Sequence, residues 1–422
     1  MSALDAPFVQ TSHMSRRHAF SSGVESVSQT NNASGLTFRA AHAFRGKPAM
    51  VRILFYNNFS TAVTYAKVGA ATMRQVSPSL SPASTVEWTQ GAPVTVPAAQ
   101  PGTNNPSANY SAWMPVYPQE SLDDPGTYLV TVFAYLDQSF TTYNANNYDV
   151  SWMESQSKVG GGWWAQRNQA GDQATNPGTF SSTAVQVRGP IAGIEALCEN
   201  GSVIVMDCGD SITAGAGQTN LGQTDIYRAC VAINSAVAAN AVGAKTVSHV
   251  RCGWGGQNSA TYGARCLYML PIIRPDILVL TAGTPNDGVP SLTGQVANRA
   301  IIQQIIDLAK SQGTRVILRG WAPHSVVADN WPQGTLTTTP TYPVATVNGD
   351  VYRLDQNARS LAMDGYGNVS YTAGMSVLGD GAVPERYQAQ YTTDLNHPND
   401  AGYAFATTNM QAAILRLLAK FK

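Results

Sequence analysis

The chain has 422 residues, of which 44% are hydrophobic and only 12% are charged. This length allows two or three domains, and the apolar content excludes global disorder. Lys plus Arg and Asp plus Glu each number 26, so the formal net charge is zero, which argues against nucleic acid or an anionic membrane as the main partner.

Neither a membrane span nor a standard signal peptide is expected from the sequence. No stretch approaches 18 consecutive apolar residues, so no membrane span is expected. The first twenty residues lack the apolar segment that a signal peptide or a twin-arginine signal would need. Either the protein is not exported by those routes or a signal has been removed. An extracellular, cell-surface or virion location therefore stays open, as does the oligomeric state.

The first half of the chain is dominated by strand patterns. Residues 1–35 are rich in Ser, Asn and Thr, which is typical of a polar arm. From 36 to 188, short β-rich runs such as 36–44 and 127–136 are separated by Gly, Pro, Asn and Asp clusters. These residues are expected to form an all-β accessory domain of the sandwich or jelly-roll type.

The pattern changes beyond Gly189-Pro190, a candidate domain boundary. Apolar strands alternate there with helical patterns, at 202–208, 224–243, 276–283, 295–313, 315–321 and 400–421. This alternation predicts a three-layer α/β domain over residues 200–422 with a mainly parallel sheet. Sites in such sheets lie at the carboxyl ends of the strands.

The five cysteines, between Cys198 and Cys266, include no C-x-x-C pair, so a zinc ribbon is not expected. Most are expected to be small buried side chains, with one or two disulfides as the alternative in an oxidising compartment. The six histidines do not cluster as metal ligands either.

The first apolar strand of the second half ends abruptly at Cys208-Gly209-Asp210-Ser211. A serine at this point exposes its hydroxyl at the sheet edge, where it could act as a nucleophile. Taken alone, it is more typical of a helix N-cap. A phosphate-binding turn is disfavoured, because the glycines at 215 and 217 come late after the strand and break the G-x-G-x-x-G pattern.

A serine nucleophile needs a base and an acid that orients the base. Of the six histidines, only His397 lies near a suitable acid, Asp394, in a loop just before the last helix. A compact D-x-x-H loop can aim both side chains at one point of the sheet edge. The same pattern also fits a helix cap with a surface histidine.

Two further stretches fall at predicted strand ends and could supply oxyanion donors. Gly253 to Gly256 allow close approach of backbone N–H groups, and the Asn286 amide is a side-chain donor. Each stretch by itself is also typical of an ordinary turn.

The joint order of these motifs resembles that of the SGNH (GDSL) hydrolase family. The resemblance covers roughly residues 200 to 420, and its most specific parts are Gly-Asp-Ser and D-x-x-H. It implies that Ser211 is the nucleophile, that His397 is the general base and that Asp394 orients His397. The reaction would be a two-step acyl transfer that needs no metal or organic cofactor.

The resemblance also implies three oxyanion donors: the N–H of Ser211, the N–H of Gly256 (with Gly255 as the alternative alignment) and the Asn286 amide. The one departure is that the usual G-x-N-D is here Gly283-Thr284-Pro285-Asn286-Asp287. Because of the extra residue and the fixed φ of Pro285, the sequence does not determine whether the Asn286 amide reaches the oxyanion.

The expected substrate is an acetyl ester of a carbohydrate, as a small molecule or a polysaccharide. Three features favour it: a neutral, amide-rich composition, a separate β-rich domain, and three tryptophans near predicted sheet ends that could stack on sugar rings, namely Trp254, Trp321 and Trp331. Core packing is the alternative role for these tryptophans. The alternative functions are a lipase or small-acyl esterase, and a catalytically inactive glycan-binding protein.

Overall fold

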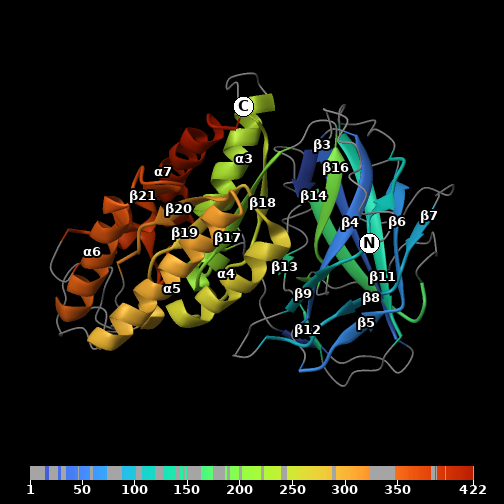
Figure 1. Ribbon diagram of the computed structural model, residues 1–422, viewed down its shortest axis with the longest axis horizontal. Helices are drawn as coiled ribbons and strands as arrows, with labels where there is room; N and C mark the ends of the chain where they lie inside the picture. Colours follow the sequence, from blue (N-terminus) through green and yellow to red (C-terminus); the bar gives the residue numbers. More distant parts are fainter. Residues whose placement is uncertain are drawn as a thin grey trace.

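The structure is a computed structural model, which shows a β-rich part and an α/β part side by side (Figure 1). The residues that it describes are 15–18, 27–29, 35–45, 47–57, 60–73, 88–100, 107–118, 127–137, 143–145, 148–149, 163–173, 186–187, 191–198, 202–219, 223–238, 245–287, 291–323, 347–381, 385, 387–394 and 396–421.

The β-rich part contains two five-stranded antiparallel sheets. The first has the order β1 (Ser15–His18), β16 (Ile191–Cys198), β4 (Pro48–Asn57) and β10 (Met114–Pro115), with β9 (Ser107–Tyr110) also paired to β4. The second has the order β14 (Trp163–Ala170), β3 (Leu36–Arg45), β11 (Thr127–Leu136), β6 (Lys67–Met73) and β7 (Trp88–Gly91). Short pairs join β2 (Val27–Gln29) to β12 (Tyr143–Ala145), β13 (Tyr148–Asp149) to β15 (Gln186–Val187), and β5 (Val63–Tyr65) to β8 (Val94–Val96).

The two large sheets enclose one apolar core because their strands alternate in the direction of their side chains. Val51, Ile53 and Phe55 of β4 share a buried cluster with Val130 and Val132 of β11. The residues between them on β4 point to the opposite face of the sheet.

The α/β part is built on a parallel sheet. Its order is β18 (Val247–Val250), β17 (Val203–Cys208), β19 (Ile277–Thr281), β20 (Arg315–Arg319) and β21 (Val369–Thr372), and every neighbouring pair is parallel. The central strands β17 and β19 are buried along their whole length, which explains their unbroken apolar runs.

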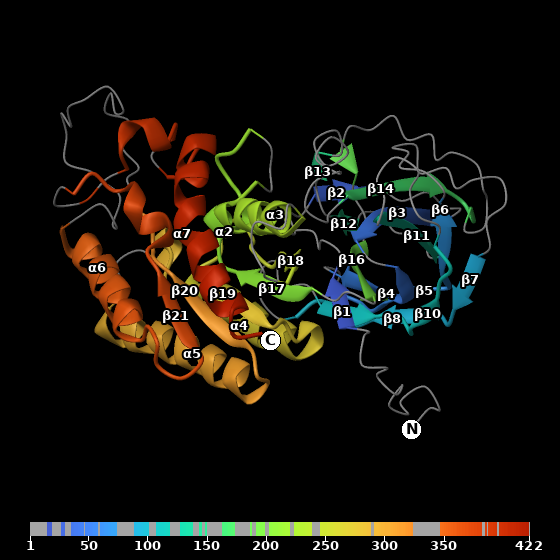
Figure 2. The same cartoon turned by 90° about the horizontal axis from the view of Figure 1, so that it is seen from above.

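Helices cover both faces of this sheet (Figure 2). α3 (Asp225–Ala238) and α7 (Asp400–Leu418) share one apolar cluster with it, and α4 (Ser259–Ile273) and α5 (Leu292–Ser311) share another on the opposite face. α6 (Val347–Ala362) packs beside β20 and β21. The short helices are α2 (Ser211–Ala214), η1 (Pro285–Asp287), η3 (Gly374–Leu378) and η4 (Ala389–Tyr391). The three-layer α/β architecture is therefore as expected.

The two parts meet through an apolar contact. Leu54 and Tyr56 of β4 lie in the same buried cluster as Cys252, and the Tyr56 hydroxyl is 3.6 Å from Cys252 Sγ. The Tyr268 hydroxyl of α4 accepts a 3.3 Å hydrogen bond from the N–H of Ala108. The outer face of the β4 sheet is thus covered by the α/β part.

In the α/β part, four of the longer elements were not among the predicted strands and helices: β18, α4, α6 and β21. The two strands have only four residues each, which is too short for a clear pattern. α4 packs against both the sheet and the β-rich part, so it lacks a polar face, and it also contains Pro271.

The division into an arm, a β domain and an α/β domain stays a proposal. Sheet pairing adds that β16, between the ranges 36–188 and 200–422, belongs with the antiparallel strands. β1, within the polar arm, pairs with β16. The candidate boundary at Gly189-Pro190 lies outside the described residues.

All five cysteines are buried free thiols, as expected of small apolar side chains. Within the described ranges, no helix is both long and apolar enough to cross a membrane. In the same ranges, His, Cys, Asp and Glu side chains form no group of three that could hold a metal ion.

Candidate active site

Ser211 lies where β17 ends and is the first residue of α2. The structure corrects the expected cap, because Asp210 is the N-cap: its Oδ1 accepts hydrogen bonds from the N–H of Ile212 (3.0 Å) and of Thr213 (3.4 Å). The carboxylate therefore starts the helix and leaves the half-buried serine hydroxyl for another partner. Gly209 makes the tight exit from β17 feasible, since a Cβ there would lie 2.2 Å from Thr213 Oγ1.

The Ser211 hydroxyl is hydrogen-bonded to His397. Its Nε2 lies 3.1 Å from Ser211 Oγ, and its Nδ1 lies 2.7 Å from Asp394 Oδ2. The loop is held in a compact form because Asp394 Oδ1 also accepts the backbone N–H groups of Asn396 (2.9 Å) and His397 (2.7 Å). The Thr392 hydroxyl donates to the His397 carbonyl at 2.8 Å. The three side chains thus form one hydrogen-bonded chain across 186 residues of sequence.

Asp394 is electrostatically suited to orient a histidine. Partial burial alone would raise its pKa, but the hydrogen bonds from the His397 ring and from the two backbone N–H groups lower the pKa below its ordinary value. The group is therefore ionised at neutral pH. A carboxylate in this state favours the tautomer with the proton on Nδ1 and leaves Nε2 as an acceptor for the serine proton.

The glycine turn lies beside the serine. Gly253 forms a parallel bridge with Gly209, and the N–H of Trp254 donates to the Gly209 carbonyl at 3.2 Å. The buried Asp207 carboxylate fixes the start of the turn by accepting the N–H of Cys252 at 2.7 Å and of Gly253 at 3.0 Å. The turn ends with the exposed Gly256, whose φ of 70° suits glycine.

Asn286 lies next to this turn despite the additional residue. Pro285 begins the 3-10 helix η1, where its fixed φ fits, and the Asn286 Nδ2 donates to the Gln257 carbonyl at 3.0 Å. The loop is anchored at both ends: the Thr284 hydroxyl donates to Asp210 Oδ2 at 2.5 Å, and Asp287 accepts the N–H and hydroxyl of Ser259 at 2.8 and 2.5 Å.

Arg265 belongs to none of the sequence motifs that predict the site, yet it contacts two of their turns. Its buried guanidinium donates to the Gly209 carbonyl at 2.8 Å and to Gln257 Oε1 at 2.9 Å, so it joins the turn before Ser211 to the glycine turn. No local signal could have identified it, because it lies in the middle of α4, which carries no recognisable pattern. The capping role of Asp210 was visible in principle, since Asp is as good an N-cap as Ser.

The structure also corrects the role expected for the tryptophans. Trp254 is 3% and Trp321 is 1% exposed, so neither offers a ring face to a sugar. Trp321 packs edge-on against Tyr352 and lies directly over Gly283, where a Cβ would be 2.5 Å from the indole ring. Both side chains serve core packing, and a third candidate, Trp331, lies outside the described residues.

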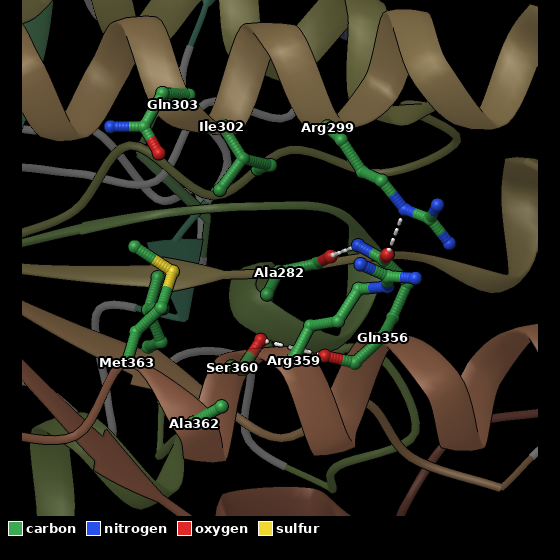
Figure 3. A pocket seen from close by; sticks show the side chains of 10 residues that line it. Ala282, Arg299, Ile302, Gln303, Gln356, Arg359, Ser360, Ala362 and Met363 are labelled. Atoms are coloured by element: carbon green, nitrogen blue, oxygen red, sulfur yellow. Dashed lines mark hydrogen bonds between the residues drawn. The ribbon is translucent and has the colours of Figure 1, made fainter.

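A cavity of about 360 Å³ lies between α5 and α6 (Figure 3). Arg299 on its rim already donates to Gln356 Oε1 at 2.7 Å and to Asp355 Oδ2 at 2.6 Å. Neither the serine, the histidine nor Asn286 lines this cavity, so we do not place the substrate there.

Comparison with known proteins gives a family match for the α/β part. Residues 208–405 match the family model described as the GDSL-like Lipase/Acylhydrolase family. The search of curated proteins returned no match.

Solved structures that resemble the chain include three acyl-transfer or lipolytic proteins. A GDSL-like lipase from Bacteroides thetaiotaomicron VPI-5482 is 19% identical with a TM-score of 0.36, covering 52% of this chain and 89% of that chain. The lipase/acylhydrolase from Enterococcus faecalis is 16% identical with a TM-score of 0.34, covering 51% of this chain and 97% of that chain. A salicylyl-acyltransferase from a tetracycline biosynthetic pathway is 12% identical with a TM-score of 0.34, covering 91% of this chain and 83% of that chain.

Proposed function

We propose that this chain, whose residues 208–405 form a domain of the GDSL-like lipase/acylhydrolase family, is a serine esterase that removes acetyl groups from carbohydrate esters. Membership of this family supports a general activity as an ester hydrolase, and it implies a small-molecule ester as substrate. The observation that carries the catalytic assignment is the hydrogen-bonded chain from Asp394 through His397 to Ser211.

In the first step, His397 Nε2 takes the proton of the Ser211 hydroxyl while Oγ attacks the ester carbonyl carbon. The carbonyl π electrons move to oxygen and form a tetrahedral oxyanion. Asp394 accepts a hydrogen bond from Nδ1–H and stabilises the imidazolium that forms. When the intermediate collapses, the C–O bond to the alcohol breaks, and Nε2 returns its proton to the leaving oxygen.

Three donors are assigned to the oxyanion. The N–H of Ser211 has no acceptor within α2, because it belongs to the first residue of the helix. Gly256 offers a second N–H. The Asn286 amide carries two N–H groups, of which one is held by the Gln257 carbonyl while the other can reach the oxyanion. Each such donor lowers the barrier by about 3 kcal/mol.

In the second step, water attacks the acyl-serine. His397 Nε2 takes a proton from the water and returns it to Ser211 Oγ as the acyl carbon–Oγ bond breaks. The carboxylic acid leaves, and the starting state is restored without a cofactor.

The carbohydrate assignment is supported by the neutral charge balance and by the large β-rich part, which a minimal esterase would not need. The buried tryptophans no longer contribute to it. A lipase or small-acyl esterase uses the same machinery and is the alternative that the substrate test decides. The hydrogen-bonded Ser211 and His397 argue against an inactive glycan-binding protein.

The test compares the parent with Ser211→Ala and His397→Ala. Acetate release from acetylated polysaccharide is measured next to hydrolysis of simple acetyl esters and long-chain acyl esters. Both variants should lose about 10⁴-fold or more in turnover. Ser235→Ala is the control, since that hydroxyl only bonds to the Val231 carbonyl of its own helix. Undiminished turnover by Ser211→Ala would overturn the mechanism, and preference for long-chain esters would overturn the substrate class.

A further inference from the structure

The far end of the nucleophile helix is held by a tyrosine from the last helix. The fully buried Tyr403 hydroxyl, on α7, lies 2.8 Å from the Ile212 carbonyl oxygen and 3.0 Å from that of Ala216. Ile212 lies in α2, where its carbonyl also accepts the N–H of Gly215 at 3.2 Å, and Ala216 lies in the turn after the helix. Burial raises the pKa of Tyr403 well above its ordinary value, so the hydroxyl stays a donor at any working pH.

The same helix carries the histidine loop. α7 begins at Asp400, three residues after His397, and its N-cap Asn399 accepts the N–H of Gly402 at 3.0 Å. The N–H of Asn399 donates to the Tyr391 carbonyl at 2.8 Å, which closes the base of the loop. His397 and Tyr403 therefore sit on one rigid unit, the first turn of α7 with its capping loop.

A second contact joins this unit to the nucleophile segment. Gly217 has a φ of 87°, and a Cβ there would lie 2.4 Å from the Pro398 carbonyl oxygen and 2.8 Å from His397 Cβ. Any side chain at 217 would therefore displace the backbone that carries the histidine. Gly217 is therefore explained by the close approach of the histidine loop, and not by binding of a phosphate.

We propose that Tyr403 and Gly217 are positioning residues that together set the separation between Ser211 Oγ and His397 Nε2. Tyr403 fixes where α7 sits along α2, and Gly217 fixes how closely the histidine loop approaches. The inference rests on the proposed function, because it treats His397 as the base. Beyond that function, the inference states that the distance between Ser211 Oγ and His397 Nε2 is set by contacts about one helical turn away from these two atoms.

The molecule offers a matched control for the tyrosine. Tyr387 is 1% exposed and belongs to the same apolar cluster as Tyr403, yet its hydroxyl has no hydrogen-bond partner among the residues that the structure describes. Tyr403→Phe and Tyr387→Phe are thus the same chemical change in the same environment, and only one removes contacts to α2.

We expect Tyr403→Phe to lower kcat on a simple acetyl ester by about 10- to 100-fold with KM within about twofold, because an error of 1 Å in the attack geometry has an effect of this size. Tyr387→Phe should stay near the parent. In a His397→Ala background, Tyr403→Phe should cause no further loss, since its effect acts through the histidine. Gly217→Ala should lower kcat in the same way. This variant tests the inference if Tyr403→Phe does not fold.

Crystal structures of the parent and of Tyr403→Phe give a readout that does not depend on activity. The distance between Nε2 and Oγ should exceed 3.5 Å in the variant. An unchanged distance, or equal kcat values for the Tyr403→Phe, Gly217→Ala and parent proteins, would overturn the inference. A parent that hydrolyses no ester would instead overturn the proposed function, and the distances would still decide the positioning role.

Discussion

At the scale of single residues, the site depends on which polar group binds which part of the backbone. Asp210 caps α2, Asp207 holds the start of the glycine turn, and Asp394 holds the histidine loop. Each of these carboxylates accepts at least two backbone N–H groups. Since charge-assisted hydrogen bonds are strong and directional, three carboxylates suffice to place three turns at one edge of the sheet.

The ionisation of Asp394 also has a consequence for stability. Its pKa is lower in the folded chain than in the unfolded chain, where a value of about 3.9 is usual. The ionised group therefore stabilises the fold above about pH 4, and this contribution is lost as the pH falls through the folded pKa.

Asn286→Ala should lower kcat by about 10²- to 10³-fold with little change in KM, because an oxyanion donor acts mainly in the transition state. Asn286→Asp should be at least as harmful, since it puts an acceptor where a donor is needed. Steady-state kinetics on an acetyl ester measure both. Asn109→Ala is the control, because that exposed amide also donates to a backbone carbonyl, at Thr95, but lies in the β-rich part. An active Asn286→Asp variant would exclude Asn286 from the oxyanion site.

At the scale of elements, a buried ion pair joins a strand of the parallel sheet to the two helices near Ser211. Arg319, the last residue of β20, donates to both carboxylate oxygens of Asp225 at 2.6 and 3.2 Å and to Thr213 Oγ1 at 3.2 Å. Asp225 starts α3 and Thr213 lies in α2, so one guanidinium holds three elements together. Both charged side chains are at most 1% exposed.

Arg319→Met should destabilise the protein by about 3–5 kcal/mol, because it leaves a buried carboxylate without its cation. Burial already raises the pKa of Asp225, and loss of Arg319 raises it further. A raised folded pKa means that stability falls as the pH rises above the unfolded value of about 3.9. The deficit of the variant should therefore be smaller at pH 5 than at pH 8.

Urea unfolding at the two pH values measures this deficit. Arg416→Met serves as the control, since Arg416 forms an exposed pair with Asp364 that contributes about 1 kcal/mol or less. A deficit for Arg319→Met that is independent of pH, or no larger than that of the control, would contradict the role given to the buried pair.

At the scale of the whole molecule, β4 contributes buried side chains to two different hydrophobic cores. Ile53 is buried between the two antiparallel sheets, whereas Leu54 is buried in the cluster that includes α4 and the glycine turn. Both side chains are fully buried. The β-rich part therefore supports α4, the helix that begins next to the proposed active site.

Leu54→Ala should increase amide hydrogen exchange in α4, while Ile53→Ala should increase it mainly in β3, β6 and β11. Each substitution removes a similar apolar volume, with a stability loss of about 2–5 kcal/mol, but from a different core. Hydrogen exchange followed by mass spectrometry distinguishes the two patterns. If both variants increased hydrogen exchange in α4 equally, the contact between Leu54 and the α/β part would not be what stabilises α4.

The sequence by itself determined the α/β class, the β-rich first half, and the triad candidates Ser211, Asp394 and His397. These features depend on local order: strand periods, a serine directly after a strand, and an acid three residues before a histidine. The tertiary structure decided what depends on packing between distant segments. It brought Ser211 and His397 to 3.1 Å and placed Asn286 beside the glycine turn. It also buried Trp254 and Trp321, because a tryptophan near a strand end can face solvent or the core, and only the neighbouring helices determine which.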